Sequence, residues 1–425
     1  MLRSFRRLTP FVATILLIEF LDELVYGARE AAWPLVRSDL GLTYAQIGIL
    51  LGLPGLIGSI VEPVLGILGD IWRRRVLVLG GGAIFAAALL LTALSRDFVL
   101  LLASFILFYP ASGAFVSLSQ ATLMDHAPDR HEQNMARWTF AGSLGVTVGP
   151  LALGASALLG GGWRGLYLFF AGLTLVLLGL AWRHTAAASP AAPENLEIGD
   201  RPPPAQAGSD ALADAGLPRS PEAHGTGAGR ALLVGLAATL RDLRRGDVLR
   251  WLVLLQFSDL MLDVLLGYLA LYFVDVAGAT PTQAGLAVAV WTGVGLLGDF
   301  LLIPLLERVD GLRYLRASVL VELVLFPAFL LARPWVVRLV LAGLLGLGNS
   351  GWYAILQARL YSALPGRSGT AMALTSMGSA AGALLPLAIG LAAERLGLGA
   401  ALWLLLLGPL ALLAGLPRGT KANRL

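Results

Sequence analysis

The chain has 425 residues, of which 57% are hydrophobic and only 14% are charged, and its formal net charge is +4. A soluble protein of this length carries about a quarter charged residues, whereas the apolar runs of about twenty residues that recur here have the length needed to cross a bilayer. The composition therefore excludes an ordinary soluble enzyme or nucleic-acid-binding protein, and predicts an all-α polytopic membrane protein.

Charge clusters and Gly/Pro turns divide the chain into twelve predicted membrane spans. These spans are placed near residues 8–32, 43–69, 76–95, 98–124, 134–159, 164–182, 248–276, 282–305, 312–332, 335–362, 368–394 and 398–416. An even number of spans puts both termini on the same side of the membrane. Most of the basic residues, including the run Arg73–Arg75, fall on that side, so the positive-inside rule predicts cytoplasmic termini in a cytoplasmic (inner) membrane.

The first span contains an acidic face. Glu19, Asp22, Glu23 and Tyr26 lie at positions i, i+3, i+4 and i+7, which share one face of a helix. Three acids near the centre of a span cost on the order of 8–10 kcal/mol on an insertion scale, so this face requires a water-filled cavity, partners or protonation. Ionisable residues inside spans are candidates for substrate or proton binding on these grounds.

The same span ends with Arg29 and Glu30, which we expect at its extracellular mouth. We expect no Arg or Lys at the depth of Asp22 in any span. Proton or substrate binding therefore explains the acidic face better than a static ion pair does.

The fifth span carries small residues at intervals of three to five positions. The glycines and proline of this pattern are Gly142, Gly145, Gly149, Pro150 and Gly154. The eleventh span repeats the pattern at four-residue spacing with Gly378, Gly382, Pro386 and Gly390. Small residues on one face let two helices approach closely, and a proline bends a helix by freeing a carbonyl group. Close helix packing is therefore predicted for both spans.

A segment without apolar runs, residues 183–247, separates the sixth and seventh spans. Up to residue 230 it is rich in Pro, Ala and Gly, a composition typical of a disordered or loosely tethered linker. Residues 231–247 place apolar and Arg-bearing positions at helical spacing, which predicts a helix on the cytoplasmic interface. A plain solvated linker helix is the alternative.

The two halves of the chain match at a constant offset of 237 residues, with polar residues in register. The matched pairs of the first and seventh spans are Glu19 and Gln256, Asp22 and Asp259, and Tyr26 and Asp263. Internal repeats of this kind are typical of transporters. The repeat predicts an N-terminal six-helix bundle at 1–182, a cytoplasmic linker at 183–247 and a C-terminal six-helix bundle at 248–425.

Three stretches resemble the major facilitator superfamily. GILGDIWRRR at 66–75 is similar to its loop signature, PLLERVDGLR at 304–313 stands where the second half carries a weaker copy, and GSLGVTVGPLALG at 142–154 is similar to the antiporter motif of its exporters. Within the superfamily, WPLVRSDLGLTYAQIG at 33–48 is most similar to the fosmidomycin-resistance type of multidrug exporter. The resemblance covers the whole chain and implies twelve transmembrane helices in two six-helix bundles.

The resemblance also implies roles for individual residues. A latch that stabilises the outward-facing state would consist of Gly66, Asp70, Arg73, Arg74 and Glu307, with the Asp70 carboxylate on a helix N-terminus or an Arg. The antiporter motif would consist of Gly145, Gly149, Pro150 and Gly154. The fourth span lacks the mid-membrane Arg that many proton-coupled members carry, so other residues would have to couple transport to protons.

The central spans of this superfamily, to which spans one and seven belong, line its cavity. The candidate proton- and substrate-binding residues are therefore Glu19, Asp22, Glu23, Tyr26, Tyr109, Gln120, Gln256, Asp259, Asp263, Asn349, Trp352 and Gln357. Clustered carboxyl groups can exchange protons near neutral pH, and an aromatic and apolar lining suits amphiphilic or cationic substrates. Glu62, Asp299 and Glu322 are secondary candidates, and Glu322 falls on a span that is peripheral by analogy with the family.

The leading hypothesis is a proton-coupled exporter of small amphiphilic or cationic compounds that works by alternating access. Its partners are the small-molecule substrate, protons and the lipid bilayer, and we expect a monomer that binds no nucleic acid and is not an enzyme. The alternatives are a lipid or lysolipid flippase, a divalent-metal exporter and, outside transport, a receptor or scaffold. The chain has no Cys and only four dispersed His residues, which exclude thiolate and His-cage metal sites. No nucleotide-binding loop is present, so we expect no cofactor beyond a proton gradient.

Overall fold

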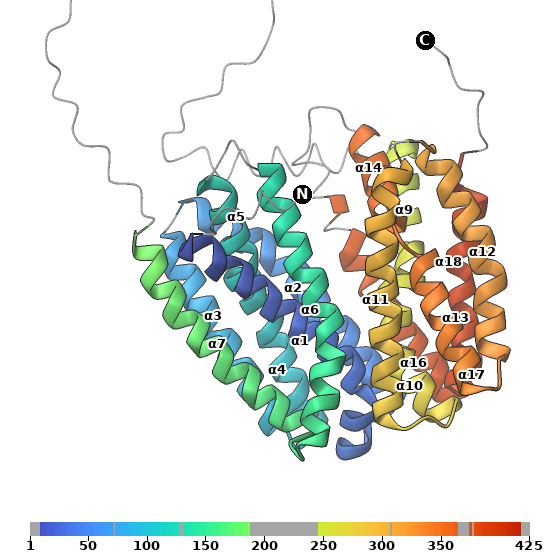
Figure 1. Ribbon diagram of the computed structural model, residues 1–425, viewed down its shortest axis with the longest axis horizontal. Coiled ribbons are helices and arrows are strands. Elements are labelled where there is room, and N and C mark those ends of the chain that lie inside the picture. The colour runs from blue at the N-terminus through green and yellow to red at the C-terminus, as the bar shows by residue number, and fades with distance from the viewer. Residues whose placement is uncertain are drawn as a thin grey trace, which may run out of the picture.

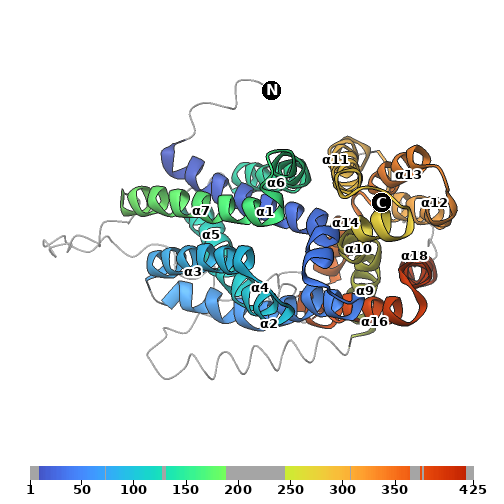
Figure 2. The same ribbon diagram turned by 90° about the horizontal axis from the view of Figure 1, so that it is seen from below.

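The computed structural model describes residues 9–71, 73–126, 131–187, 245–306, 308–363, 374–375 and 378–417. These residues form helices and short turns, and the helices gather into two bundles that stand side by side (Figures 1 and 2). The all-α fold of two bundles is thus as predicted. Glu307, most of the predicted linker and most of the predicted interfacial helix lie outside the described residues.

The first bundle holds the first half of the chain. Its helices are α1 (Pro10–Leu40), α2 (Tyr44–Ile71), α3 (Arg74–Leu94), α4 (Phe98–Ser112) with its continuations η2 (Gly113–Ser117) and α5 (Leu118–His126), α6 (His131–Leu158) and α7 (Gly162–Ala187). η2 is a π-helical turn, so α4, η2 and α5 form one span with a local widening.

The second bundle holds the second half. Its helices are α9 (Gly246–Asp259) with its continuations η4 (Leu260–Val264), α10 (Leu265–Leu271) and η5 (Tyr272–Val276), then α11 (Pro281–Leu306), α12 (Gly311–Leu331), α13 (Trp335–Gly348), α14 (Trp352–Ala363), α16 (Leu385–Leu396), and α17 (Leu398–Ala401), η6 (Leu402–Leu406) and α18 (Leu407–Gly415). The pieces α13 and α14 belong to one span, which is interrupted at residues 349–351.

Helix α1 is longer than predicted. The predicted span ends at residue 32, whereas the helix continues to Leu40. It begins at Thr9, whose side chain accepts a hydrogen bond from the backbone N–H of Val12 at 3.3 Å, and Thr is a favoured N-cap residue. It ends at Gly41, which has a left-handed φ of 62° that suits glycine. Pro34 lies within the helix without ending it.

Eleven helices among the described residues are long and apolar enough to cross a membrane. Helix α1, with 31 residues, is also long enough, but its charged residues keep it out of that group. Its side chains are largely buried between other helices, and Trp33 is only 1% exposed, so α1 meets the bilayer less than its neighbours do. With α1 included, the count agrees with the predicted twelve spans.

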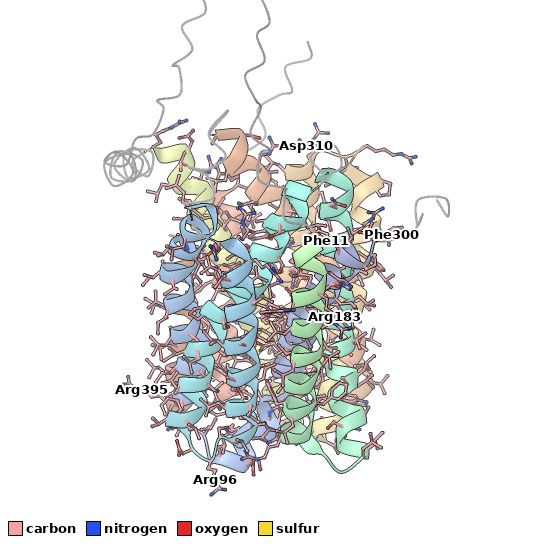
Figure 3. The ribbon with its side chains drawn as sticks, turned by 90° about the vertical axis from the view of Figure 1, so that its left-hand side faces the viewer. Phe11, Arg96, Arg183, Phe300, Asp310 and Arg395 are labelled. Atoms are coloured by element: carbon pink, nitrogen blue, oxygen red, sulfur yellow. The ribbon has the colours of Figure 1, made fainter. Side chains whose placement is uncertain are left out.

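The two bundles meet along α1, α2 and α6 of the first and α10, α11 and α16 of the second. We call the end of the molecule where α1 begins the near end, and the end where α1 finishes the far end. In Figure 3, Asp310 marks the near end and Arg96 and Arg395 mark the far end.

Candidate functional site

The acidic face of α1 packs against the glycines of α6. A Cβ atom added at Gly142 would lie 2.7 Å from Oε1 of Glu19, and one added at Gly145 would lie 2.9 Å from Cβ of Glu23. One added at Gly149 would collide with the backbone of α1 at Ala28. The predicted close packing of this span is therefore present, and it seats Glu19, which is only 7% exposed, between two helices.

The second half repeats this arrangement. The amide of Gln256, the counterpart of Glu19, lies against Gly378 and Gly382, with 3.2 Å from its Nε2 to a Cβ added at Gly378. Glu19 and Gln256 thus both occupy space that glycines of the neighbouring span leave free. The buried oxygen of Gln256 has no hydrogen-bond partner among the described residues.

Asp22 lies on the side of α1 that faces α4. The hydroxyl group of Ser112 donates a hydrogen bond of 2.9 Å to its Oδ1. Asp22 and Glu23 are both partly buried. The carboxyl groups of Glu19, Asp22 and Glu23 therefore sit at helix interfaces rather than in lipid, as their cost in the membrane requires.

Arg29 and Glu30 contradict the expectation that they form an extracellular mouth. They are 7% and 1% exposed and form an ion pair of 2.7 Å. Nη1 of Arg29 donates to the hydroxyl of Tyr109 at 3.0 Å, and Nε1 of Trp33 donates to Glu30 at 3.0 Å. The expectation failed because the span was ended at its charged residues, whereas these charges are partnered inside the bundle.

The guanidinium group of Arg29 also stacks over aromatic rings, 4.8 Å from the ring centre of Tyr26 and 5.6 Å from that of Tyr109. Arg29 lies seven residues after Asp22 and three after Tyr26, so it continues the same face of α1. A cation does therefore stand near the depth of the acids, contrary to the prediction, but three of its five N–H donors bind Glu30 and Tyr109.

Tyr26 and Asp263, which the repeat pairs, meet across the two bundles. The hydroxyl of Tyr26 donates to Oδ1 of Asp263 at 3.4 Å. Residues that are equivalent in the two halves meet in this way only where the two bundles face each other about their common axis. This pair therefore marks the centre of the molecule.

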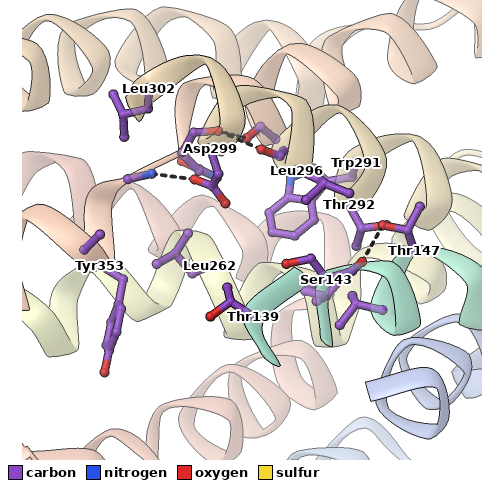
Figure 4. A pocket seen from close by; sticks show the side chains of 18 of the residues that line it. Thr139, Ser143, Thr147, Leu262, Trp291, Thr292, Leu296, Asp299, Leu302 and Tyr353 are labelled. Atoms are coloured by element: carbon purple, nitrogen blue, oxygen red, sulfur yellow. Dashed lines mark hydrogen bonds between the residues drawn. The ribbon is translucent and has the colours of Figure 1, made fainter. Parts of the chain in front are cut away.

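A cavity of about 650 Å³ opens beside this pair, between α6 and α11 (Figure 4). Its polar lining consists of Tyr26, Thr139, Ser143, Thr147, Asp263, Trp291, Thr292, Asp299, Asn349, Ser350 and Tyr353. Leucines such as Leu262, Leu296 and Leu302 form much of the remaining wall. The lining extends to Leu306, the last residue of α11, and thus toward the near end.

Two acidic residues line this cavity, Asp263 and Asp299, and both are exposed. No Arg or Lys is among the described residues that line it. The cavity is therefore negative in character and otherwise mainly apolar, a combination that favours cations with apolar parts.

Sequence reasoning missed a row of hydroxyl groups on α6. Thr139, Ser143 and Thr147 follow one another at four-residue spacing and line the cavity (Figure 4). The four-residue spacing of these hydroxyl groups is present in the sequence, but the glycines between them were interpreted as packing residues and the hydroxyl groups were not considered. The indole of Trp291, which projects into the same cavity (Figure 4), was also missed.

The interrupted span between α13 and α14 forms one wall of the cavity. Gly351 has a φ of 73°, a left-handed conformation that favours glycine, and its backbone N–H donates to Oδ1 of Asp299 at 3.0 Å. Asn349 is 3% exposed, and its Nδ2 donates to the carbonyl of Met261 at 2.9 Å. Asp299 thus holds the start of α14 with one oxygen.

Several predicted cavity residues lie elsewhere. Trp352 is fully buried within the second bundle and its Nε1 donates to Ser318. Gln357 donates to the hydroxyl of Thr375 at 3.0 Å. Gln120 is partly buried in α5, and Asp259 is partly buried on α9, and neither is part of the cavity lining.

The predicted latch is only partly within the described residues. Gly66 and Asp70 lie toward the end of α2, and Arg73 is the N-cap residue of α3, which Arg74 begins. The side chain of Asp70 and the whole of Glu307 are outside the described residues, so the latch stays a prediction. In the antiporter motif, Pro150 lies within α6, whereas a Cβ atom added at Gly154 would meet nothing within 4 Å.

The far end is closed by polar contacts between the bundles. Nη1 of Arg37 and the hydroxyl of Tyr44 donate to Oδ2 of Asp275 at 2.7 and 2.8 Å. The backbone N–H of Tyr44 donates to Glu394 at 2.9 Å. The Arg37–Asp275 side chains are 31% and 22% exposed, so this pair lies near the surface.

Below these polar contacts, α2 and α16 touch through small residues. A Cβ atom added at Gly48 would lie 2.9 Å from the carbonyl oxygen of Pro386, and one added at Gly52 would collide with the carbonyl oxygen of Ala383. The missing side chains let the two backbones approach closely. We call the contacts of Gly48 and Gly52 with the span of α16 the far-end seam.

The family model of the Major Facilitator Superfamily matches residues 15–386. Among solved structures, the chain is similar to a bacterial homolog of the human lysosomal transporter Spinster in an inward-facing and occupied conformation, at 14% identity and a TM-score of 0.67, covering 96% of this chain and 95% of that one. The POT family transporter PepTSo is similar at 15% identity and a TM-score of 0.65, covering 96% of both chains. The nucleoside transporter NupG is similar at 13% identity and a TM-score of 0.67, covering 95% and 98%. No curated protein matches the sequence. At these identities the solved structures establish the fold alone.

Proposed function

This chain belongs to the Major Facilitator Superfamily, and on that basis we propose that it is a proton-coupled exporter of small cationic or amphiphilic compounds. Membership of the family makes the protein a multi-pass membrane transporter of small molecules. The direction of transport, the coupling ion and the substrate class are what we propose in addition.

The cavity between α6 and α11 carries the proposal. Its exposed carboxylates, Asp263 and Asp299, provide negative charge, and its leucines and aromatic rings provide apolar surface. Arg29 does not neutralise this charge fully, because it is paired with Glu30 at 2.7 Å. A cation with an apolar body would therefore find both a charge partner and a wall.

Proton coupling rests on the acids that flank the cavity. Asp263 meets Tyr26 of the other bundle, and Asp22 lies one helical turn before Tyr26, on the same face of α1. A cation at Asp263 and a proton at the same carboxyl group exclude each other. Competition of this kind is a simple basis for exchange of one cation against protons.

We place the near end in the cytoplasm, where the positive-inside rule puts the termini. The far-end seam and the Arg37–Asp275 pair then close the extracellular side, while the cavity lining continues to the near end. These features support an inward-facing conformation, ready to take substrate from the cytoplasm.

The test is transport of ethidium, an apolar cation, into liposomes that contain the purified protein. With an acidic lumen, we expect ethidium to accumulate, and nigericin, which collapses the pH gradient, to abolish the accumulation. Liposomes without protein are the control. Accumulation that does not change on addition of nigericin would contradict proton coupling, and transport of a fluorescent lysolipid without ethidium would favour the flippase instead.

Replacing Gly52 with Val should open the extracellular side, because the new side chain collides with the carbonyl oxygen of Ala383 in the far-end seam. The chain contains no cysteine, so a Cys introduced at Leu51, which packs against Gly267 of the other bundle, is its only thiol. We expect a membrane-impermeant maleimide to label this Cys faster in the Gly52→Val protein.

The matched control is Gly80→Val on α3, where an added Cβ atom meets nothing within 4 Å. This variant has the same loss of helix propensity from a β-branched residue, but its side chain does not collide with a neighbouring helix. Equal labelling rates in both variants would show that the seam does not hold the extracellular side closed.

A further inference from the structure

Glu322 is a buried acid that the proposed mechanism does not use. It lies in the middle of α12, is 0% exposed, and neither of its carboxyl oxygens has a hydrogen-bond partner among the described residues. An ionised carboxylate without partners is among the most costly groups to bury, and it takes up a proton instead. A proton on the carboxyl group of Glu322 would remove this cost.

The carboxyl group is seated against the interruption between α13 and α14. A Cβ atom added at Gly348, the last residue of α13, would lie 3.2 Å from the carboxyl carbon of Glu322 and closer to one of its oxygens. The glycine thus makes room for the acid. Residues 349–351, which follow directly, line the transport cavity, so Glu322 lies directly behind the cavity wall.

Polar side chains beside Glu322 tie α12 to this interruption. The hydroxyl of Ser318, one helical turn before Glu322, donates to the carbonyl of Gly348 and accepts from Nε1 of Trp352. The hydroxyl of Tyr314 donates to the carbonyl of Ser350 at 3.1 Å. Ser318 and Trp352 carry donors that could turn to a carboxylate if the wall moved.

No cation neutralises Glu322 in the described structure. The charged and titratable residues with described side chains on α12 and on the neighbouring α11, α13 and α14 are Arg313, Tyr314, Arg316, Asp299, Arg338, Tyr353 and Arg359. Arg338 stands over the ring of Tyr272, and Arg359 pairs with Asp310. Arg316 lies about 120° around α12 from Glu322. The packed elements α18 and η6 contain no titratable residue.

We propose that Glu322 is a proton-binding site of the second bundle, separate from the central cavity, and that the interruption at residues 349–351 controls its access to water. The proton stays while Ser318 holds Gly348, and leaves when the interruption rearranges and offers the carboxylate donors or water. The same interruption contains Asn349 and binds Asp299 of α11 through the N–H of Gly351, both on its cavity side, so the proton and the cavity wall are linked through one short segment.

The test uses infrared spectroscopy on the full-length protein in phospholipid membranes at neutral pH, without any substrate. The difference spectrum of wild type minus Glu322→Gln should contain the C=O band of a protonated carboxyl group without a hydrogen bond. Glu394→Gln is the control, because Glu394 is exposed and accepts a hydrogen bond from the backbone N–H of Tyr44. The difference spectrum of wild type minus Glu394→Gln should contain a carboxylate band instead. Absence of the carboxylic acid band in the first difference would overturn the proposal.

Access is tested by the rate at which this band shifts in D₂O. We expect slow exchange in the wild type and faster exchange in Ser318→Ala, which removes the bond to Gly348 but keeps the acid. An unchanged exchange rate would show that the interruption does not control Glu322. Because no substrate is used, the result stands or falls independently of the proposed transport function.

Discussion

Replacing Asp263 with Asn should abolish transport of ethidium driven by the pH gradient. Asp263 is exposed in the cavity and bonds only weakly to Tyr26, at 3.4 Å, so its charge is available to a cation. A hydrogen bond to a charged group contributes roughly 1.5–3 kcal/mol, so we expect ethidium binding to weaken about 10- to 100-fold. Fluorescence titration of the purified protein measures the binding, and the liposome assay measures the transport.

The matched control for this prediction is Asp259→Asn. Asp259 lies one turn before Asp263 on the same span but is not part of the cavity lining. We expect it to keep most of the ethidium affinity of the wild type. If Asp259→Asn loses binding and Asp263→Asn keeps it, the cation site lies one helical turn away at Asp259, beside Gly382 of the eleventh span.

Replacing Arg29 with Met should destabilise the protein by roughly 3–5 kcal/mol, because it leaves the buried carboxylate of Glu30 without its partner. Glu30 is 1% exposed and would keep one bond, from Trp33. We expect a clear fall in the midpoint of thermal unfolding in detergent. The double variant Arg29→Met with Glu30→Gln removes both charges and should recover much of the loss.

Arg37→Met provides the comparison for a partly exposed pair. Arg37 and Asp275 are 31% and 22% exposed, and such pairs contribute about 0–1 kcal/mol. The midpoint should therefore move little. A fall in Arg37→Met as large as that in Arg29→Met would mean that the depth of Arg29 has no energetic consequence.

The helical periodicity and the internal repeat of the sequence predicted much of the fold and part of the site. The face formed by Glu19, Asp22 and Tyr26 is present on α1, and the repeat partner of Tyr26, Asp263, does meet it. Gly142, Gly145 and Gly149 of α6 pack as their spacing predicted, whereas Gly154 does not. These features depend on local geometry, and a single sequence contains that information.

What the sequence could not predict depends on contacts between distant helices. Besides its ion pair with Glu30, Arg29 donates a hydrogen bond from Nη1 to the hydroxyl of Tyr109 on α4, and no residue near Arg29 in the chain predicts this second partner. Trp352 turns away from the cavity because Ser318 of α12 binds its indole nitrogen. Residues of this kind are oriented by neighbours 80 and 34 positions away.

The far-end seam has a consequence for the conditions in which the protein rests. On the proposed orientation the extracellular closure consists of backbone contacts at Gly48 and Gly52, with the partly exposed Arg37–Asp275 ion pair and two hydrogen bonds of Tyr44 above them. Raising the ionic strength from 0.1 to 1 M shortens the Debye length from about 10 to 3 Å, which weakens only the ion pair. Since that pair contributes at most about 1 kcal/mol, the ratio of closed to open molecules should fall by no more than about fivefold. The transporter should therefore rest closed to the outside in dilute and in saline surroundings alike.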